Sequence, residues 1–220
     1  MEQKTFKLKK EGGSHYCVEA CSLNEAIKKM ASEKCCFGVN WFLDFSDTEL
    51  IDENLSGANL EGSRFAGAVL KNVNFTNAKL KDADFSGALL IDCDFSGTDL
   101  SESRFSGAKL EGIKINGAKA SDADFSSATI SGFDSFMTNY CRAKFEAVAL
   151  KESSFHQDSL SLANMSGANL ERTSFDEIDF YGTDFTEVVI VNCKFLDTAF
   201  VYAKKWETVK EIDCTFERCI

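Results

Sequence analysis

An apolar residue returns at every fifth position over most of this chain. The series that begins at Leu50 is mostly Leu or Phe as far as Phe200, for example at Leu60 and Phe65, and a small residue such as Ala58 usually stands two places earlier. A helix repeats at about 3.6 residues and a strand at about 2, so neither element explains this period. The spacing predicts a backbone that turns a corner every five residues.

The same series also repeats at every twentieth residue. Leu50, Leu70 and Leu90 begin a column that stays aliphatic, whereas Phe65 and Phe85 begin a column that is nearly all Phe. Four fives with one preferred side-chain type per column predict the four walls of a square coil, and each wall stacks on itself at a spacing of about 4.8 Å. We expect seven to eight coils around a narrow apolar core.

Individual units such as AlaAsnLeu at 58–60 and AlaAspPhe at 83–85 carry a further signature. They resemble the A-(D/N)-L-x-x motif of the pentapeptide-repeat family, and the match holds its register over about 150 of the 220 residues. The resemblance implies an all-β fold, a right-handed quadrilateral β-helix. It implies much less about function, because one fold serves many functions.

The two ends of such a rod need covering, because an open coil exposes apolar residues and sheet edges. The division that we expect is an N-terminal α/β cap element, the pentapeptide-repeat β-helix and a C-terminal cap or dimerisation tail, at residues 1–48, 49–202 and 203–220. In the first part, TFKLK and YCVEA read as short strands, and a helix follows the capping-box pair Ser22 and Glu25. The segment CCFGVNWFLDF, residues 35–45, is expected to lead into the first coil. A separate recognition module is the alternative to a cap or a side-packed helix.

The last residues depart from the five-residue rule. They place Trp206, Val209, Ile212 and Phe216 on a short helix or strand. In the gyrase-targeting members of the family that the chain resembles, an apolar C-terminal element makes a dimer. Plain capping of the rod and a homodimer are therefore both open for this tail.

The charge of the chain is concentrated on the repeat. Of a formal net charge of −11, most arises between residues 50 and 200, which hold 13 Lys and Arg against 23 Asp and Glu. Direct binding to nucleic acid is disfavoured, since contacts to phosphate need a basic face.

The chain shows no stretch of 18 apolar residues and no export signal at its start, so we expect a cytoplasmic protein that does not bind membranes. Its nine cysteines are then interpreted as reduced thiols. Their spacing, C-x3-C and an adjacent Cys-Cys, is not typical of a zinc site, so no metal or other cofactor is expected.

Catalytic motifs are missing from the sequence. The two histidines are His15 and His156, and there is no nucleophile elbow, P-loop or HExxH. We therefore expect no enzyme. Asp158 is unusual, because its place in the repeat points inward. A local bulge that turns Asp158 outward is the favoured explanation, and a buried functional carboxylate is the alternative.

Three outward-facing groups are candidates for contact with a partner. Asp82, Glu102 and Asp122 form a column of like charges, and their repulsion costs stability unless Lys79, Lys81 or Lys119 shields them. A partner with a basic groove would relieve this repulsion. The alternative for this column is a solvated face.

The second group is apolar and lies on the aliphatic wall, where Val69, Leu89 and Ile91 face outward. Such surface marks an interface, and we expect the N-terminal helix or a second copy of the chain to cover it.

The third group is Phe136 and Met137. In the same unit Phe133 is large where a small residue is usual and Ser135 is small where a large one is usual, so we expect the two to exchange roles inside the coil. Phe136 and Met137 would then point outward, one coil from His156.

These observations favour a non-enzymatic binding protein that displays surfaces of a β-helix to an unidentified protein partner. The alternative, which the family resemblance implies, is an acidic mimic of duplex DNA. Such a protein would bind a type II topoisomerase such as gyrase, and would modulate it or protect it from fluoroquinolones.

Overall fold

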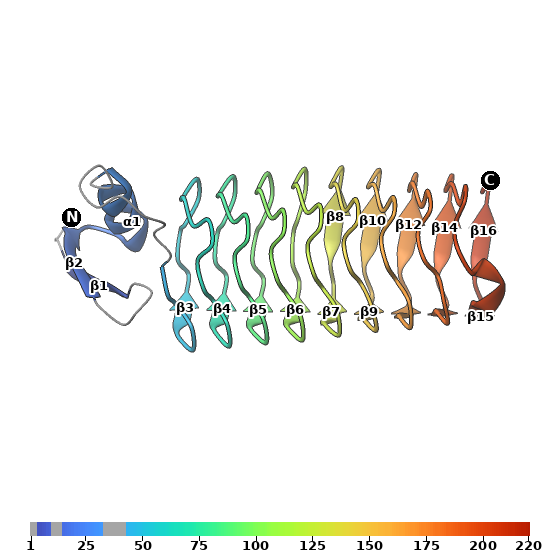
Figure 1. Ribbon diagram of the computed structural model, residues 1–220, viewed down its shortest axis with the longest axis horizontal. Helices are drawn as coiled ribbons and strands as arrows, with labels where there is room; N and C mark the ends of the chain where they lie inside the picture. The colour runs from blue at the N-terminus through green and yellow to red at the C-terminus, as the bar shows by residue number, and fades with distance from the viewer. Residues whose placement is uncertain (1–3, 10–14, 33–42) are drawn as a thin grey trace.

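The structure is a computed structural model that describes residues 4–9, 15–32 and 43–220 of the chain. From residue 43 onward the chain winds into a rod of stacked four-sided coils (Figure 1). All strands of the rod are parallel to their neighbours. The predicted quadrilateral β-helix is confirmed.

Two walls of the rod form sheets. One is a nine-stranded wall with strands β3 (Glu49–Ile51), β4 (Val69–Lys71), β5 (Leu89–Ile91), β6 (Lys109–Glu111), β7 (Thr129–Ser131), β9 (Ala149–Lys151), β11 (Asn169–Glu171), β13 (Val189–Val191) and β15 (Lys210–Ile212). The other is a five-stranded wall with β8 (Asp134–Phe136), β10 (Ser154–His156), β12 (Ser174–Asp176), β14 (Lys194–Leu196) and β16 (Thr215–Glu217). Isolated bridges, such as Asn59 with Lys79 and Arg64 with Asp84, join the coils on the remaining two walls.

The register of the coils is the twenty-residue period of the sequence. Leu50 pairs with Leu70, and Leu70 pairs with Leu90. Each column therefore stacks directly on itself, as the pattern predicted. Repeating hydrogen bonds join each coil to its neighbours, for example from the Phe85 amide to the Arg104 carbonyl (2.7 Å) and from the Leu89 amide to the Ala68 carbonyl (2.9 Å).

The core is a stack of aromatic rings beside small side chains. Phe85 lies parallel to Phe65 and Phe105, with ring centroids 4.6 and 4.7 Å apart, and Phe75 meets it edge-on at 6.1 Å. Ala83 is fully buried and belongs to the same apolar cluster as this stack. The parallel and edge-on contacts are both favourable ring geometries.

Each corner is built from two recurring local features. The residue before the apolar centre accepts a hydrogen bond from the amide two places later, as Asp84 Oδ1 does from Ser86 (3.0 Å). The residue two places after the centre has a left-handed backbone, for example Gly87 (φ 66°) and Asn77 (φ 57°). Asp and Asn suit the first position as Asx turns, and Gly, Asn and Asp tolerate the second. These two demands explain the (D/N) of the repeat and the glycines at its corners.

The N-terminal element consists of a hairpin and a helix. Strands β1 (Lys4–Lys9) and β2 (His15–Ala20) pair antiparallel, and helix α1 (Leu23–Ser32) follows them. Ser22 Oγ accepts the Glu25 amide (3.1 Å), so the predicted start of the helix is confirmed. Of the segment expected to lead into the first coil, residues 35–42 lie outside the described part of the chain.

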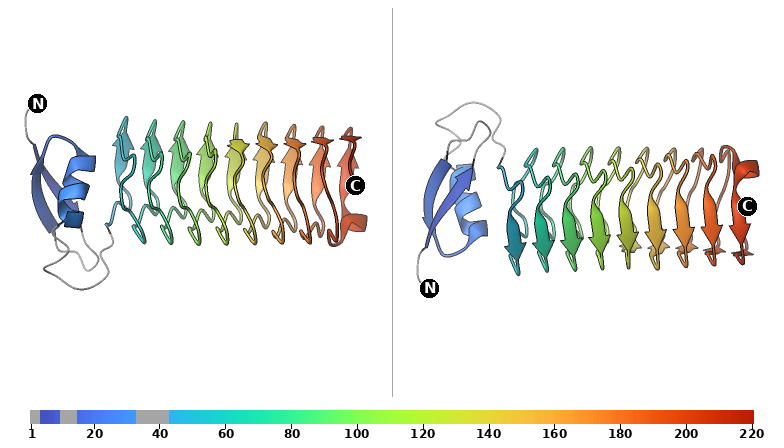
Figure 2. Two further views of the ribbon diagram at one scale, coloured as in Figure 1. Left: turned by 90° about the horizontal axis from the view of Figure 1, so that it is seen from above. Right: turned by 90° about the horizontal axis from the view of Figure 1, so that it is seen from below.

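Helix α1 packs at the end of the rod. The Asn24 side chain donates to the Ser56 carbonyl (3.1 Å), and Ile27 belongs to the same buried apolar cluster as the coils. Figure 2 shows the helix beyond the first coil, not along a wall. The expectation that this helix covers Val69, Leu89 and Ile91 is therefore wrong, because its apolar face is used on the end of the rod.

The tail continues the coil instead of leaving it. Its strands β15 and β16 pair with β13 and β14 at an offset of 21 residues, because one residue is inserted around the 3-10 helix η2 (Trp206–Thr208). Trp206 packs against Phe200, with ring centroids 4.5 Å apart, and Phe216 stacks on Phe195 at 4.9 Å. The sequence left a short helix or a strand open for this tail, and the tail contains both, as parts of a final coil.

Candidate functional site

The acidic column occupies corner positions. Asp82, Glu102 and Asp122 have φ values of 56°, 61° and 60°, so each lies in the left-handed position of its turn. This geometry points their side chains away from the core, as expected. The next residue of the same column is Arg142, with φ 61°.

Cations neutralise this column. Arg142 donates to both carboxylate oxygens of Asp122, at 2.8 and 2.7 Å, and Lys81 lies 3.0 Å from Glu102. Arg104 lies 3.8 Å from Asp82. The bonds from Arg142 hold the pKa of Asp122 below its usual range, and the bond to Glu102 raises the pKa of Lys81. Lys81 therefore shields the column as the sequence suggested, and Arg142 was visible there as the residue twenty places after Asp122.

The half-buried, outward-facing Val, Leu and Ile residues of the nine-stranded wall form two groups. Val69, Leu89 and Ile91 are half-buried on β4 and β5, and Val69 stands directly beside Leu89. The second group, Val189 and Val191, lies on β13 near the other end of the wall.

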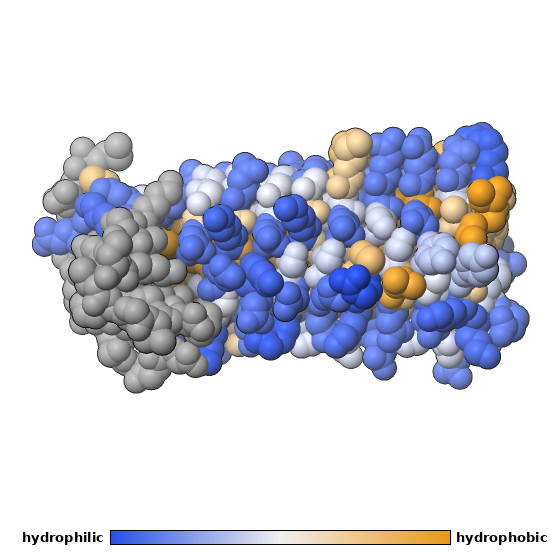
Figure 3. All heavy atoms as spheres, turned by 45° about the horizontal axis from the view of Figure 1, so that its top comes forward, coloured by the Kyte–Doolittle hydropathy of each residue, from blue (hydrophilic) through white to orange (hydrophobic). Residues whose placement is uncertain are grey.

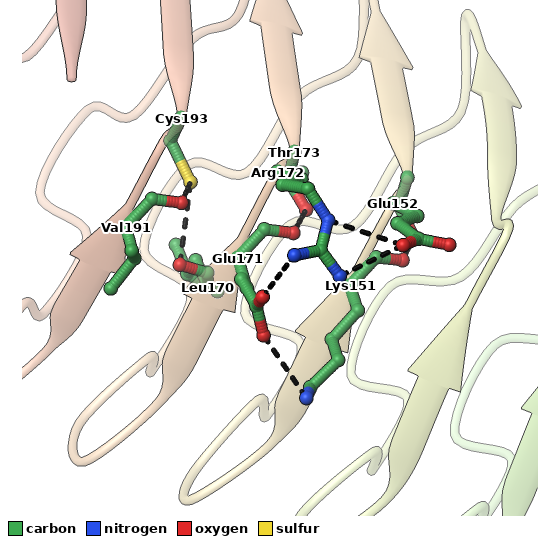
Figure 4. A network of polar contacts seen from close by, with 9 residues as sticks. Lys151, Glu152, Leu170, Glu171, Arg172, Thr173, Val191 and Cys193 are labelled. Atoms are coloured by element: carbon green, nitrogen blue, oxygen red, sulfur yellow. Dashed lines mark hydrogen bonds and ion pairs between the residues drawn. The ribbon is translucent and has the colours of Figure 1, made fainter. Parts of the chain in front are cut away.

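A network of ion pairs lies between these groups, next to the second one (Figure 4). Arg172 donates to Glu152 at 2.8 and 3.1 Å and also to Glu171, and Lys151 lies 3.0 Å from Glu171. The bond from Lys151 is the main cause of the lowered pKa of Glu171. The wall therefore alternates apolar and charged sections along the rod.

Phe136 and Met137 are exposed on the five-stranded wall and its corner. Their exposed fractions are 39% and 59%. Phe136 stacks on His156 of the next coil with ring centroids 5.4 Å apart, and His156 Nδ1 lies 3.0 Å from Asp176. Met137 has φ 53°, in the left-handed corner position. Figure 3 shows a mainly hydrophilic surface on which apolar side chains stand in separate groups.

A buried polar cluster lies directly beneath these residues. Asp158 is 2% exposed and accepts hydrogen bonds from the Thr138 amide (2.6 Å) and the His156 amide (3.2 Å). Burial raises the pKa of its carboxyl to about 7. The favoured explanation of a bulge at Asp158 is therefore wrong, because β10 keeps its register with both neighbours and two amides hold the carboxyl inside.

The exchange of Phe133 and Ser135 is confirmed. Both side chains are buried, and Ser135 Oγ lies 2.9 Å from the hydroxyl of Tyr140. Burial raises the pKa of Tyr140 well above its usual value, so this group stays a neutral phenol. The cluster is closed to solvent, and its groups satisfy one another.

Cys93, Cys141, Cys193, Cys214 and Cys219 form no disulfide. Cys93 is buried, and burial raises the pKa of its thiol to about 11. Burial also raises the pKa of Cys193, whose Sγ donates to the Leu170 carbonyl at 3.4 Å. Such protonated thiols are poor nucleophiles and metal ligands. Across residues 4–9, 15–32 and 43–220, no group of three or more His, Cys, Asp or Glu side chains is placed to hold a metal ion. In the same ranges, no helix has the length and apolar character needed to span a bilayer.

Comparison with known families agrees with the geometry of the coils. A family model described as pentapeptide repeats matches in 8 copies, over residues 44–82, 54–90, 78–117, 103–134 and 160–195. The chain belongs to the pentapeptide-repeat family. A search of curated proteins found no match.

Solved structures of pentapeptide-repeat proteins resemble this one. HetL, which is involved in heterocyst differentiation regulation in the cyanobacterium Nostoc sp. strain PCC 7120, is 19% identical with a TM-score of 0.48, over 91% of this chain and 94% of HetL. A trypsin-treated form of QnrB1, a plasmid-mediated fluoroquinolone resistance protein, is 19% identical with a TM-score of 0.50, over 78% of this chain and 83% of QnrB1. At such identities the likeness shows the fold alone.

Proposed function

We propose that this pentapeptide-repeat protein is a non-enzymatic binding protein that presents apolar side chains from its rigid rod to a protein partner in the cytoplasm. The observation that carries the proposal is the pair Phe136 and Met137. They stand side by side with 39% and 59% of their surface exposed, on a coil whose backbone is bonded to both neighbours. Exposed apolar groups on a rigid scaffold are typical of recognition sites, because little conformational freedom is lost on binding.

The corner position of Met137 strengthens this argument. A left-handed backbone disfavours a side chain of this kind, and Gly, Asn or Asp would relieve the strain. Met137 therefore costs stability where it stands, and burial of its side chain against a partner would offset that cost. Leu162 provides a matched comparison, because it is exposed at another corner with φ 60°.

The test is affinity capture with two variants. Met137→Asn should lose the partner while the protein stays folded or becomes slightly more stable. Leu162→Asn makes the same exchange at a corner of another wall and should keep the partner. Equal capture by the wild type and both variants would remove Phe136 and Met137 as the binding surface.

The second candidate function is mimicry of duplex DNA toward a type II topoisomerase. It is favoured by the excess of acid, with 23 acidic and 13 basic residues between positions 50 and 200, and by the fold shared with QnrB1. The cations on Asp82, Glu102 and Asp122 weigh against a continuous negative stripe on that column. Under this function the chain binds the enzyme and not nucleic acid itself.

A gyrase supercoiling assay with and without a fluoroquinolone separates the two functions. The DNA-mimic function predicts inhibition or drug protection at micromolar protein, weakened by Asp82→Asn, Glu102→Gln and Asp122→Asn together. If the protein at tens of micromolar affects neither supercoiling nor the action of the drug, the first function stands, with a partner other than gyrase.

A further inference from the structure

The outer face of the nine-stranded wall has an approximate two-fold pattern about its central strand, β7. Four strands lie on each side of β7, and the pairing order runs from β3 at one end to β15 at the other. Of the four pairs of residues at equal distances from Ser131, two are complementary in kind, and the other two set Ile91 against Glu171 and Lys71 against Val191. Glu111 and Lys151 stand one strand away on either side, and Ile51 and Ile212 stand four strands away.

We propose that two copies of this chain pack face to face through their nine-stranded walls, antiparallel along the rod, with the two-fold axis along β7. A rotation about β7 reverses the order of the strands and keeps the position of each residue along its strand. Glu111 then meets Lys151 of the second copy, and Lys151 meets its Glu111. The contact is isologous, so each pair forms twice.

The shape of the wall supports this register. A hollow of about 340 Å³ lies over β9, β11 and β13, where its lining includes Ala149, Asn169 and Val189. The rotation places Leu89 of the second copy opposite Asn169 and Val69 opposite Val189. The side with larger apolar residues therefore meets the hollow, and the small Ala149 faces Lys109.

The ends of the wall also match. Ile51 and Ile212 are 47% and 53% exposed, and each would cover the other. Glu49 would meet Lys210 beside them. Glu171, which falls opposite Ile91, is already neutralised by Lys151 at 3.0 Å and by Arg172, so its charge is not left unpaired in the contact.

The size of the face predicts a weak dimer. Nine strands about 4.8 Å apart and three residues of about 3.3 Å give a face of roughly 40 by 10 Å, or about 800 Å² in total for two copies. Stable interfaces bury about 1,200–2,000 Å², whereas smaller ones are transient. We expect association only at micromolar concentrations and above.

The decisive experiment is a charge exchange followed by mixing, measured by sedimentation at up to about 200 µM. Glu111→Lys alone and Lys151→Glu alone should each abolish the dimer, because two like pairs then face each other. An equimolar mixture of the two variants should form a heterodimer, since both contacts become opposite in sign. The wild type should dimerise, and Leu89→Glu should weaken it at least tenfold.

Controls separate this wall from the end of the rod. Ile220→Glu changes the exposed final coil and should leave the dimer intact, and thermal unfolding confirms that each variant is folded. A wild-type monomer at 200 µM would overturn the proposal. So would a dimer that survives Leu89→Glu but is lost with Ile220→Glu, or two single variants that fail to associate when mixed.

Discussion

The first coils and the middle of the rod use the same backbone with different interiors. Phe65, Phe85 and Phe105 stack in parallel without interruption. In the middle, Ser135 and Asp158 enter the core and bond to Tyr140 and Thr138. The coil register is unchanged across both regions. The backbone pairing therefore tolerates a polar interior when every buried group finds a partner.

The largest effect is expected in the aromatic stack. Phe85→Ala removes a fully buried ring with parallel neighbours on both sides and should cost about 3–5 kcal/mol of unfolding free energy. Urea unfolding followed by circular dichroism measures the loss. Ile115→Ala, which removes a buried aliphatic side chain from the column that holds Phe75 and Phe95, should cost less. Equal losses would mean that ring stacking adds nothing to burial.

The next effect tests the polar interior. Asp158→Thr should stabilise the protein at pH 8, because Thr138 and Thr198 occupy the same column and donate to backbone carbonyls. The pKa of Asp158 is raised from 3.8 to about 7, so the folded state keeps a proton that the unfolded state releases between these values. The unfolding free energy of the wild type should therefore fall with rising pH in this window, by up to about 1.4 kcal/mol per unit.

The pH dependence itself is the control for this variant. The difference between Asp158→Thr and the wild type should be small near pH 4 and constant above pH 7. A difference that does not change with pH would show that the carboxyl is ionised throughout or that the substitution acts through packing alone.

A smaller effect is expected at the corners. Asp84→Ala removes the acceptor for the Ser86 amide and should lower the unfolding free energy by about 1 kcal/mol. Asp84→Asn keeps the acceptor and should behave as the wild type does in thermal melts. Loss of stability in both variants would assign the effect to charge and not to the turn.

The smallest effect concerns the acidic column. Asp122→Asn breaks an exposed pair with Arg142, and exposed pairs contribute little. The melting temperature should change slightly at low salt and not at all in 1 M salt, where such charges are screened. A large, salt-independent change would show that the column is part of the framework.

The sequence predicts the parts of this molecule that repeat and fails where a single residue decides. The period of twenty predicted the columns, and the exchange of Phe133 and Ser135 followed from column position alone. Asp158 was wrongly predicted to turn outward, because the cost of burying its carboxyl is reduced by two backbone amides that the repeat pattern does not show. The position of α1 was also wrongly predicted, because the sequence shows its apolar face but not which surface that face covers. The neutralised acidic column was predictable, since Arg142 continues it.

The inserted residue near η2 shows how this architecture changes length. The extra residue is absorbed at one corner, and β15 and β16 still pair with the coil before them. A duplication of twenty codons within the repeat would therefore add one coil and lengthen the rod by about 4.8 Å, with every column continued. Genes for such rods can grow or shrink in whole turns, and the spacing between two binding surfaces becomes a heritable quantity that is adjusted in equal steps.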